Sequence, residues 1–456
     1  MAAPTSSPQR GSWGSHLGFL LAAVGSAVGL GNMWRFSYVA AEGGGATFVL
    51  LYLTFVALIG IPLMTSELIV GRMTQVSPVE ALKRLGGSTW TPTAWLFVFC
   101  GFGILSYYSV IAGWTIRFAL DGIRGAIPED TASYFGSVGT GMPAIVTHVL
   151  FMAITVVIVL GGVKKGLERA AVVLMPLLFF LLVGLAIWAA TLSGGGAGYA
   201  YYLKPQVNEL LNPRIITSAA GQAFFSLSLG MGALMTYASY LRNERNLAGE
   251  AATIALADFG VAFVAGLIVF PIIFHFNLGD AIGLGGALNE DSTVGTLFIA
   301  IPPALRTLGE KGNIIIGAFF TMLFFAALTS SISLLEVVVA AVIDGWGWTR
   351  KRATLTFGVL ITLTGVPSAF SLNFLGAADK LVGTFLLMLG GLLTSILVGY
   401  KILPKAQAEL AIGLENVFAR KAFTVFVRFV APPVLVVVLL FAIPSVLAAF
   451  GALFGG

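Results

Sequence analysis

The stretch WGSHLGFLLAAVGSAVGLGNMWRFSY, residues 13–38, decides the fold because it is an apolar membrane-spanning segment that is broken near its centre. Gly25, Gly29 and Gly31 interrupt it beside the polar Asn32, and each Gly inside a helix costs roughly 1 kcal/mol relative to Ala. A second stretch, SAAGQAFFSLSLGMGALMTYASY at 218–240, carries the same kind of interruption. Open backbone at membrane depth persists only where protein or a water-filled cavity satisfies it. Two such breaks in corresponding places indicate a transporter with its binding site at the membrane midplane.

The composition is that of a polytopic membrane protein. Of the 456 residues, 58% are hydrophobic and only 10% are charged, whereas soluble domains carry about 25% charged residues. The net charge of +5 is spread over short loops and gives no nucleic-acid signature. The single cysteine, Cys100, lies in an apolar segment and is interpreted as a buried, inert thiol. The sequence has no HExxH, GxSxG or P-loop pattern, so nothing indicates hydrolysis or ATP-driven work.

Eleven apolar segments are each long enough to cross the roughly 30 Å apolar layer of a bilayer. We place them at residues 13–40, 46–71, 90–120, 143–160, 167–191, 215–241, 251–276, 312–343, 352–371, 376–402 and 425–451. The first five and the next five segments each begin with a broken helix. Because five is odd, the second set runs with opposite orientation in the membrane. The predicted fold class is therefore an all-α polytopic membrane protein with a 5+5 inverted repeat and one extra helix.

The predicted organisation has a tail, two repeats and a last helix. These parts cover residues 1–12, 13–191, 215–402 and 425–451, with an extracellular lid at about 277–312. The apolar piece TVGTLFIAIPPAL at 293–305 is too short to span and is interpreted as a re-entrant or lid hairpin, with a solvated loop as the alternative. Most Lys and Arg residues fall on the side of the N-terminus, which places the N-terminus in the cytosol and the C-terminus outside the plasma membrane.

Four motifs resemble the neurotransmitter:sodium symporter family, and they occur in the order and spacing of that family. They read GSAVGLGNMWRF at 25–36, KGLERAAVVLMP at 165–176, GQAFFSLSLGMGALMTYASY at 221–240 and FAALTSSIS at 325–333. The chain looks most like the bacterial eleven-span members that carry several hydrophobic amino acids. It departs from the family at Ser37, where Pro is usual, and it has no twelfth span. The resemblance implies the LeuT fold and sodium-coupled import of hydrophobic L-amino acids by alternating access.

The resemblance also implies two sodium sites at the broken helices, where free carbonyls can bind a hard cation. The first site would be formed by Ala27, Asn32, Ser226 and Asp258 with the substrate carboxylate. The second would be formed by Gly25, Val28, Ala326, Thr329 and Ser330. By itself, the run TSS at 329–331 is more typical of helix packing, and only the match to the family reverses that interpretation.

Two acidic residues lie inside apolar segments. A charge such as that of Asp258 at the centre of a span costs about 2.5–3.5 kcal/mol on insertion scales. A protonated, hydrogen-bonded Asp is the alternative to a sodium ligand. Because the carboxylate would supply the negative charge beside sodium, we expect no chloride requirement. Glu67 is expected, with help from Gln222, to brace the free N–H groups of the broken helices, as its equivalent does in the family.

The substrate pocket is assigned by the same resemblance, because a Met or an aromatic residue in a membrane helix is otherwise more often simple packing. Its expected residues are Ala27, Gly29, Leu30, Gly31, Ile104, Tyr108, Phe225, Ser226, Ser228, Met231, Ser330, Ser333 and Leu334. The Tyr108 hydroxyl would hold the substrate carboxylate. Monoamine carriers place an Asp where this chain has Gly29, so an amino acid is favoured over a decarboxylated amine. Met231 is flexible and polarizable, which suits a range of apolar side chains.

Gates and a flexible helix complete the expected machinery. The outer gate would pair Arg35 with Asp379 under an aromatic lid, Phe225. The inner gate would pair Arg10 with Asp344, and Trp13 and Tyr240 would close the cytosolic side. Gly166 and Pro176 would let the fifth span unwind to open a water path to the second sodium, with ordinary kinking as the alternative.

The sequence therefore predicts a chloride-independent symporter rather than an enzyme, with two sodium ions, a hydrophobic L-amino acid and the lipid bilayer as its partners. No nucleic acid is expected, and the monomer is expected to be functional. Three alternatives remain at this point: a proton-coupled carrier of the same fold, an intramembrane enzyme and a channel. The oxygen set of Asn32, Thr329 and Ser330 argues against proton coupling alone, and the paired gates argue against a channel.

Overall fold

The computed structural model describes residues 11–241, 245–278 and 296–454, and this part of the chain is helical without strands. The first half contains α1 (His16–Ala27), η1 (Gly31–Arg35), α2 (Phe36–Glu42), α3 (Ala46–Phe55), η2 (Val56–Gly60), α4 (Ile61–Thr74), α5 (Pro78–Gly86), η3 (Ser88–Trp90), α6 (Thr91–Ile123), α7 (Thr131–Val138), α8 (Gly141–Leu160), η4 (Val163–Glu168), α9 (Arg169–Ala189), α10 (Gly196–Leu203) and η5 (Val207–Glu209). The second half contains α11 (Pro213–Ser226), α12 (Ala233–Ala238), α13 (Leu247–His275), α15 (Thr296–Arg306), α16 (Glu310–Trp346), α17 (Arg350–Phe370), α18 (Leu372–Ala378), η7 (Asp379–Leu386), α19 (Leu387–Ile396), η8 (Leu397–Lys401), α20 (Leu403–Ala411), α21 (Val417–Val425), η9 (Phe426–Val430) and α22 (Ala431–Phe454).

The first predicted break is confirmed. α1 ends at Ala27, where Val28 turns into an extended conformation, and the chain resumes as the π-helical η1 before α2. The axes on the two sides of this break are inclined by 47°. π-Helical turns are rare and are frequently found at functional sites. The sequence GSAVGLG thus opens the backbone in the middle of a membrane span.

The second predicted break is also confirmed. α11 ends at Ser226, α12 begins at Ala233, and residues 227–232 between them form turns. Gly230 and Gly232 have φ values of 78° and 71°, which Gly adopts at no steric cost. A Cβ at Gly230 would lie 2.0 Å from the carbonyl oxygen of Leu387, so the close approach of α19 also requires Gly there.

The remaining spans agree with the predicted all-α membrane architecture. Among the described residues, nine helical segments are long and apolar enough to cross a membrane, and the bent pair α1 and η1–α2 adds a tenth. α11 and α12 together account for the eleventh predicted segment. The described part of the predicted lid is one short helix, α15, whose Ile299 carbonyl accepts a hydrogen bond from Thr131 of α7. The rest of the lid, 279–295, lies outside the described residues.

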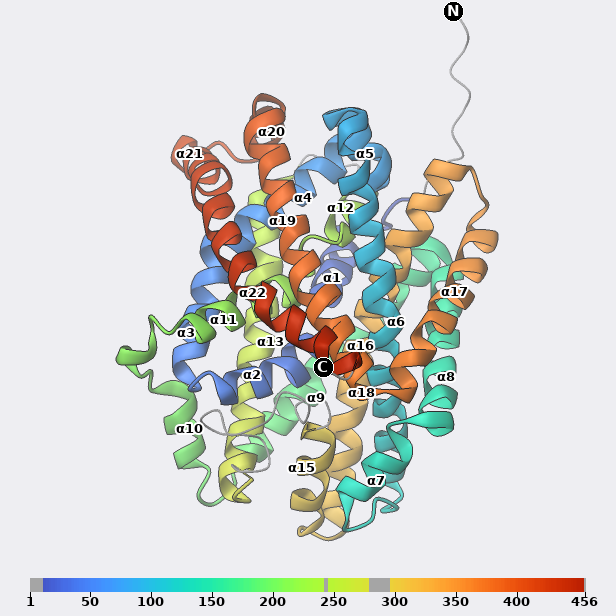
Figure 1. Cartoon of the computed structure of the whole chain (residues 1–456), viewed down its shortest axis with the longest axis vertical. Helices are drawn as coiled ribbons and strands as arrows, with labels where there is room; N and C mark the ends of the chain where they lie inside the picture. The colour runs from blue at the N-terminus through green and yellow to red at the C-terminus, as the bar shows by residue number, and fades with distance from the viewer. Residues whose placement is uncertain (1–10, 242–244, 279–295, 455–456) are drawn as a thin grey trace, which may run out of the picture.

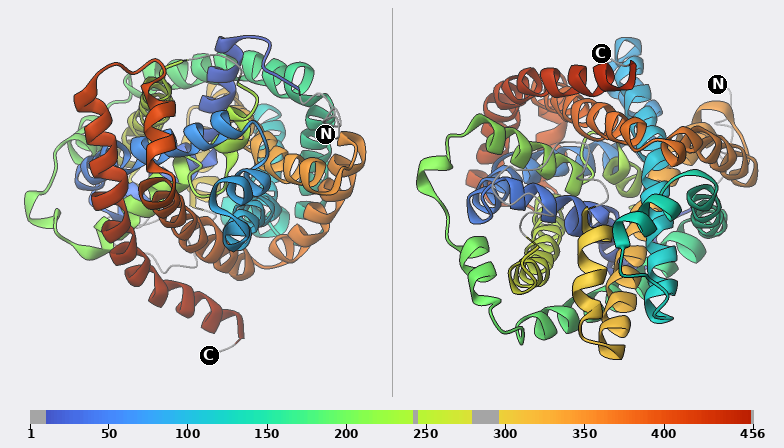
Figure 2. Two further views of the ribbon diagram at one scale, coloured as in Figure 1. Left: turned by 90° about the horizontal axis from the view of Figure 1, so that it is seen from above. Right: turned by 60° about the horizontal axis from the view of Figure 1, so that its bottom comes forward.

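The helices stand side by side, and their ends form two opposite faces of the molecule (Figure 1). α16 runs through the centre, because 94% of the residues in its most apolar stretch are buried. In α6, which packs beside it, the corresponding share is 78%. α8, η4–α9 and the segment Val417–Gly451 have only 28–33% buried and therefore lie at the periphery. Viewed from above, the end of α22 extends away from the helical body (Figure 2). Both broken helices pack against the central α16, which places their breaks inside the protein.

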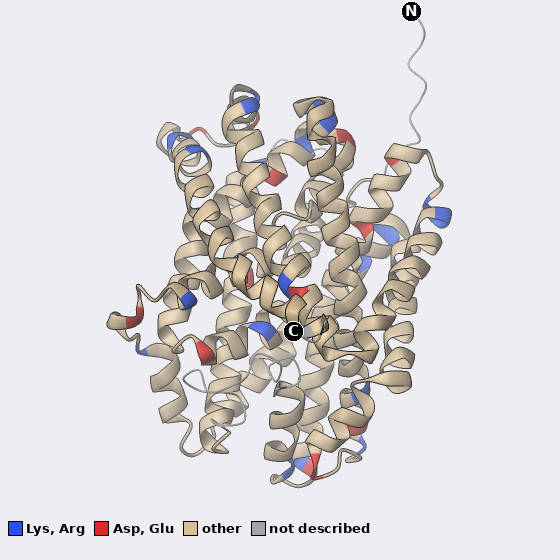
Figure 3. Ribbon diagram, in the orientation of Figure 1, with Lys and Arg blue, Asp and Glu red and all other residues tan. Residues whose placement is uncertain are grey.

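Many charged residues lie at the two ends of the bundle, and others lie between the ends (Figure 3). Lys and Arg lie at the ends of α5, α20 and α21 on one face. Among the acidic residues of the described chain, Asp258, Glu67 and Glu336 are buried. A buried charge is costly unless it is paired or hydrogen-bonded, so these residues mark candidate functional positions.

Candidate functional site

A buried carboxylate from α13 meets the first break. Asp258 is fully buried, and its Oδ1 accepts a hydrogen bond from the Asn32 amide at 2.7 Å. Its Oδ2 accepts from Ser226 Oγ at 2.7 Å and from the Tyr52 hydroxyl at 3.1 Å. The Asn32 Oδ1 in turn accepts the N–H of Gly29 at 2.9 Å. No Lys or Arg forms an ion pair with this carboxylate among the described residues.

The arrangement around Asp258 fits a hard cation. Carboxylate, amide and hydroxyl oxygens are the ligands that such cations prefer. Three of the four residues predicted for the first sodium site, Asn32, Ser226 and Asp258, are joined by hydrogen bonds, and the fourth, Ala27, lines the adjacent cavity. Tyr52 was not predicted. Its only sequence signal is that it is one of three hydroxyl-bearing residues, with Thr47 and Thr54, in the otherwise apolar run ATFVLLYLTF.

A second cluster of oxygen atoms joins α16 to the end of α1. Thr329 Oγ1 lies 3.4 Å from the carbonyl oxygen of Val28, and Ser330 Oγ lies 3.4 Å from that of Gly25 and 3.3 Å from that of Val28. Thr329 Oγ1 also lies 3.0 Å from the carbonyl oxygen of Ala326. The contacts across the two helices are long for hydroxyl hydrogen bonds, whose usual distance is about 2.7–2.8 Å. All five residues predicted for the second sodium site thus meet in an oxygen-rich corner that suits a hard cation.

A cavity lies between the two breaks. It is lined by ten of the thirteen predicted pocket residues, namely Ala27, Gly29, Gly31, Ile104, Tyr108, Phe225, Ser228, Met231, Ser330 and Leu334. The other three lie next to it. Leu30 donates its N–H to the Tyr108 hydroxyl at 2.9 Å, Ser226 binds Asp258, and Ser333 accepts from Ser26 at 2.8 Å. The lining therefore combines apolar side chains with a few hydroxyl and backbone groups.

Ser26 is a second residue of the site that was not predicted. It lines the cavity, and its carbonyl oxygen accepts from Ser228 at 2.9 Å and from Ser330 at 3.2 Å. This carbonyl joins α1, the second break and α16 at one point. It belongs to the last turn of α1, whose carbonyls have no partner within a helix that ends there. That position within the first break was the signal available in the sequence.

The predicted supports lie at the breaks but act separately. Glu67 Oε1 accepts the N–H of Gly230 at 2.8 Å, as expected for a brace of the second break. Gln222 donates to the carbonyl oxygen of Gly31 at 2.8 Å, and its Oε1 accepts from Arg35 at 3.1 Å. Gln222 therefore braces the first break and the outer arginine, whereas Glu67 braces the second break.

The predicted outer pair is assembled beside the cavity. Arg35 Nε lies 3.7 Å from Asp379 Oδ2, and the Arg35 guanidinium lies 4.8 Å from the ring centre of Phe225. Asp379 also accepts from the Tyr107 hydroxyl at 2.9 Å, and Arg35 donates to Thr384 at 3.0 Å. Both charged residues belong to π-helical segments, η1 and η7, where backbone geometry departs from the α-helix. The pair lies at one end of the cavity, because Phe225, which lines the cavity, also contacts the Arg35 guanidinium.

The opposite end is closed by aromatic residues. Trp13 donates its indole N–H to the carbonyl oxygen of Tyr237 at 2.9 Å, and its ring lies 6.4 Å from that of Tyr240. The Tyr240 hydroxyl donates to the buried Glu336 at 2.6 Å. Of the predicted inner pair, Arg10 lies outside the described residues. Asp344 accepts the N–H of Ser77 at 2.6 Å.

The predicted flexible segment is helical in this structure. Gly166 lies in the π-helical η4, where a Cβ would come within 2.1 Å of the carbonyl oxygen of Ile158, and Pro176 lies inside α9. Glu168 at the end of η4 accepts from the N–H of Gly14 at 2.6 Å and from Ser15 at 2.8 Å. The segment is thereby tied to the start of the first broken helix.

Comparisons with known proteins agree with this architecture. Residues 10–137 and 133–449 match the Sodium:neurotransmitter symporter family. The chain is 36% identical over 450 residues to an uncharacterized sodium-dependent transporter, YhdH, of Bacillus subtilis, covering 94% of this chain and 96% of the relative. It is 36% identical over 406 residues to the uncharacterized sodium-dependent transporter MJ1319 of Methanocaldococcus jannaschii, covering 85% of this chain and 81% of the relative. The crystal structure of MhsT in complex with L-phenylalanine matches with a TM-score of 0.86 at 39% identity, covering 95% of this chain and 100% of that chain. The likeness therefore extends over nearly the whole chain.

Proposed function

The chain belongs to the sodium:neurotransmitter symporter family, and we propose that it imports hydrophobic L-amino acids together with two sodium ions. It is a multi-pass, sodium-dependent transporter with the LeuT fold rather than an enzyme. The finer statements, on substrate class, ion number and orientation, are our proposal. They are supported by the chemistry of the cavity and of the two oxygen clusters beside it.

The observation that carries the substrate proposal is the cavity between the breaks. Ile104, Phe225, Met231 and Leu334 give it apolar walls. Tyr108 accepts the N–H of Leu30, which places its hydroxyl at the broken helix, where it can donate its hydrogen to a carboxylate. The helix that begins after the first break directs its N-terminal partial positive charge toward the same place. This combination suits a substrate that carries its own carboxylate and an apolar side chain, such as the L-phenylalanine that occupies MhsT.

Sodium binding is proposed to organise the two breaks. One ion would join Asn32, Ser226, Asp258, the Ala27 carbonyl and the substrate carboxylate. The other would join the α16 hydroxyls of Thr329 and Ser330 to carbonyls at the end of α1. Because both sets link the broken helices to their neighbours, bound ions would stabilise the assembled substrate site. The Asp258 carboxylate supplies the negative charge that chloride would otherwise provide.

Alternating access would follow from opening one end of the cavity at a time. On the outer side, Arg35 and Asp379 with Phe225 would part. On the inner side, Trp13 and its tyrosine partners would part, with η4 loosening its hold on the start of α1. The excess of Lys and Arg at the face formed by α5, α20 and α21 supports a cytosolic assignment of that face, with the N-terminus inside.

Uptake into proteoliposomes tests the substrate proposal. We expect labelled leucine or phenylalanine to accumulate with an inward sodium gradient and to stop when choline replaces sodium. Unlabelled Leu, Ile, Val, Met, Phe and Trp should compete, because each offers a carboxylate and an apolar side chain. Lysine, glutamate and monoamines should not. Preferential displacement by a decarboxylated amine would contradict the proposed role of Tyr108.

A methyl group at Gly29 should impair binding. A Cβ there would lie 2.4 Å from Ser330 Oγ and 2.8 Å from the Tyr108 hydroxyl. Overpacking of this kind costs about 1–3 kcal/mol, which corresponds to a roughly five- to hundredfold loss of affinity for Gly29→Ala. Substrate affinity is measured by competition binding in detergent. Gly260→Ala in α13 is the matched control, because a Cβ there meets nothing within 4 Å and should leave affinity unchanged.

A further inference from the structure

Two arginines, Arg420 and Arg428, lie in the last apolar segment without an acidic partner among the described residues, and Arg428 is the one farther along the span. Arg428 belongs to η9, in the segment Val417–Gly451 that is long and apolar enough to cross a membrane. No carboxylate pairs with it among the described residues, and its Nε is buried without a hydrogen-bond partner. Arginines in spans are rare and usually pair with protein groups or reach toward the membrane surface. The positive charge of Arg428 therefore needs an acceptor that the described protein does not provide.

Two aromatic rings hold this guanidinium at the periphery of the bundle. It lies 5.0 Å from the ring centre of Tyr400 and 5.4 Å from that of Phe429. Both rings are more than half exposed, and the Tyr400 hydroxyl donates to the carbonyl oxygen of Arg428. Gly399 permits this crossing, because its Cβ position lies only 3.3 Å from the Arg428 Cα. The contacts fix the guanidinium on a surface that would face lipid.

The surroundings are positively charged. Lys401 at the end of η8 and Lys405 in α20 are exposed, and α21 carries Arg420 and Lys421. The acidic residues of the α20–α21 hairpin are Glu409 and Glu415. Of these, Glu409 is already paired with Arg72. The described hairpin thus carries an excess of positive charge close to Arg428.

We propose that Arg428, Tyr400 and Lys401 form a binding site for the phosphate of an anionic phospholipid in the cytosolic leaflet. The assignment to that leaflet rests on the membrane orientation proposed above. Guanidinium binds phosphate through two parallel hydrogen bonds, and Lys401 adds a point charge from the neighbouring helix end. Basic pockets between spans on the cytosolic side suit anionic headgroups. The acyl chains would lie along the exposed apolar side chains of α22, including Val436, Val437 and Leu440.

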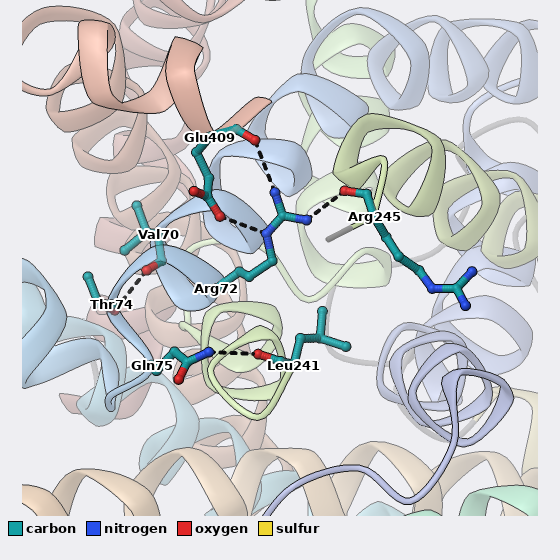
Figure 4. A network of polar contacts seen from close by, with 7 residues as sticks. All are labelled: Val70, Arg72, Thr74, Gln75, Leu241, Arg245 and Glu409. Carbon is teal, nitrogen blue, oxygen red and sulfur yellow. Dashed lines mark hydrogen bonds and ion pairs between the residues drawn. The ribbon is translucent and has the colours of Figure 1, made fainter. Parts of the chain in front are cut away.

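Arg72 joins the α20–α21 hairpin next to the site to the chain that follows the second broken helix (Figure 4). Arg72 Nε lies 2.7 Å from Glu409 Oε1, and the same guanidinium donates to the carbonyl oxygens of Glu409 and Arg245 at 3.0 and 2.6 Å. Gln75, the residue that follows α4, donates to the carbonyl oxygen of Leu241 at 3.0 Å. Leu241 follows α12, the inner part of the second broken helix. A lipid that steadies the hairpin would therefore also steady the cytosolic end of this helix.

Lipid binding to the purified, full-length protein tests the proposal. Native mass spectrometry in detergent, with phosphatidylglycerol titrated against phosphatidylcholine, should show preferential retention of phosphatidylglycerol by the wild type. Arg428→Gln should weaken that retention about tenfold, the loss expected for a charge-assisted bidentate contact. Arg428→Lys should keep part of it as a point charge. Lys83→Gln, which removes an exposed charge on α5 outside the α20–α21 hairpin, is the matched control and should change retention little.

Each contrary outcome is specific. Equal retention of phosphatidylglycerol by wild type and Arg428→Gln overturns the site. Equal retention of phosphatidylcholine by the wild type overturns the charge argument. Displacement by inorganic phosphate at the same concentration as the lipid identifies a site for free phosphate and overturns the lipid assignment. Because retention is measured without transport, a failure of the proposed substrate or sodium coupling would leave this result intact. A melting curve of each variant shows that it is folded.

Discussion

Asp258→Asn is expected to weaken the sodium response of uptake by ten- to hundredfold. The carboxylate is fully buried, accepts hydrogen bonds from Asn32, Ser226 and Tyr52, and has no cationic partner among the described residues. A unit charge 4 Å from a cation is worth about 4 kcal/mol at an effective dielectric constant of 20, and the oxygen ligand that Asn retains offsets part of this loss, which leaves the ten- to hundredfold effect. The measurement is the sodium concentration that gives half-maximal uptake.

The anion dependence of wild-type uptake tests whether Asp258 acts through its charge. Wild-type uptake should be nearly unchanged when gluconate replaces chloride, because Asp258 already balances the charge of sodium. Asp130→Asn is the control with the same chemical change, since Asp130 is an exposed cap of α7 and Asn caps helices equally well. Collapse of wild-type uptake in gluconate, or normal sodium dependence in Asp258→Asn, would contradict the charge-balance account.

Removing the hydroxyls of Thr329 and Ser330 should have the second largest effect. These groups lie within 3.4 Å of the carbonyl oxygens of Val28 and Gly25, across the contact between α16 and α1. The double variant Thr329→Ala/Ser330→Ala leaves those carbonyls without side-chain ligands. Interactions with a charged group are worth about 1.5–3 kcal/mol, so we expect half-saturation by sodium to rise at least tenfold. Uptake is again measured against sodium concentration.

Two further variants separate sodium binding from substrate binding and from folding. Ser330 also lines the substrate cavity, whereas Thr329 does not. We therefore expect Thr329→Val alone to weaken sodium binding and to leave the substrate affinity, measured at saturating sodium, nearly unchanged. Ser331→Ala is the matched control, because its hydroxyl bonds to the Ala327 carbonyl of the same helix. An unaltered sodium response in the double variant would exclude the second ion site.

The membrane architecture could be predicted because it depends on local properties of the chain. Apolar segments of membrane-spanning length are recognised by composition, and the breaks are recognised because Gly clusters cannot continue a helix cheaply. Gly230 illustrates this directly. Its φ is positive, and a Cβ at this position would lie only 2.0 Å from the carbonyl oxygen of Leu387, so both features require Gly. The helix ends were predicted less well. The span placed at 312–343 is a helix from Glu310 to Trp346, because a helix can continue beyond the apolar layer.

The candidate site was predicted through motifs, and its unpredicted members lie outside them or act through the backbone. Tyr52 of α3 completes the set of hydrogen-bond donors around Asp258. In the sequence, however, nothing distinguishes it from a tyrosine that packs in the core or lies at the membrane interface. Gln222 was expected to assist Glu67 but bonds to Gly31 and Arg35. Ser26 contributes a carbonyl oxygen, which every residue has. Hydrogen-bond partners of this kind follow from direction and distance, and residue type gives no information about either.

The sequence by itself determined the class of protein, the two breaks and the oxygen-bearing residues near them, because helix formation and transfer into lipid act on neighbouring residues. Only the tertiary structure decided which of these residues meet. Asn32 and Asp258 are 226 positions apart, and Ser330 and Gly25 are 305 apart, yet each pair is in contact. Such contacts arise because every buried polar group in a membrane must find a partner inside the protein. Which partner it finds depends on how the central α16 and the two broken helices pack together.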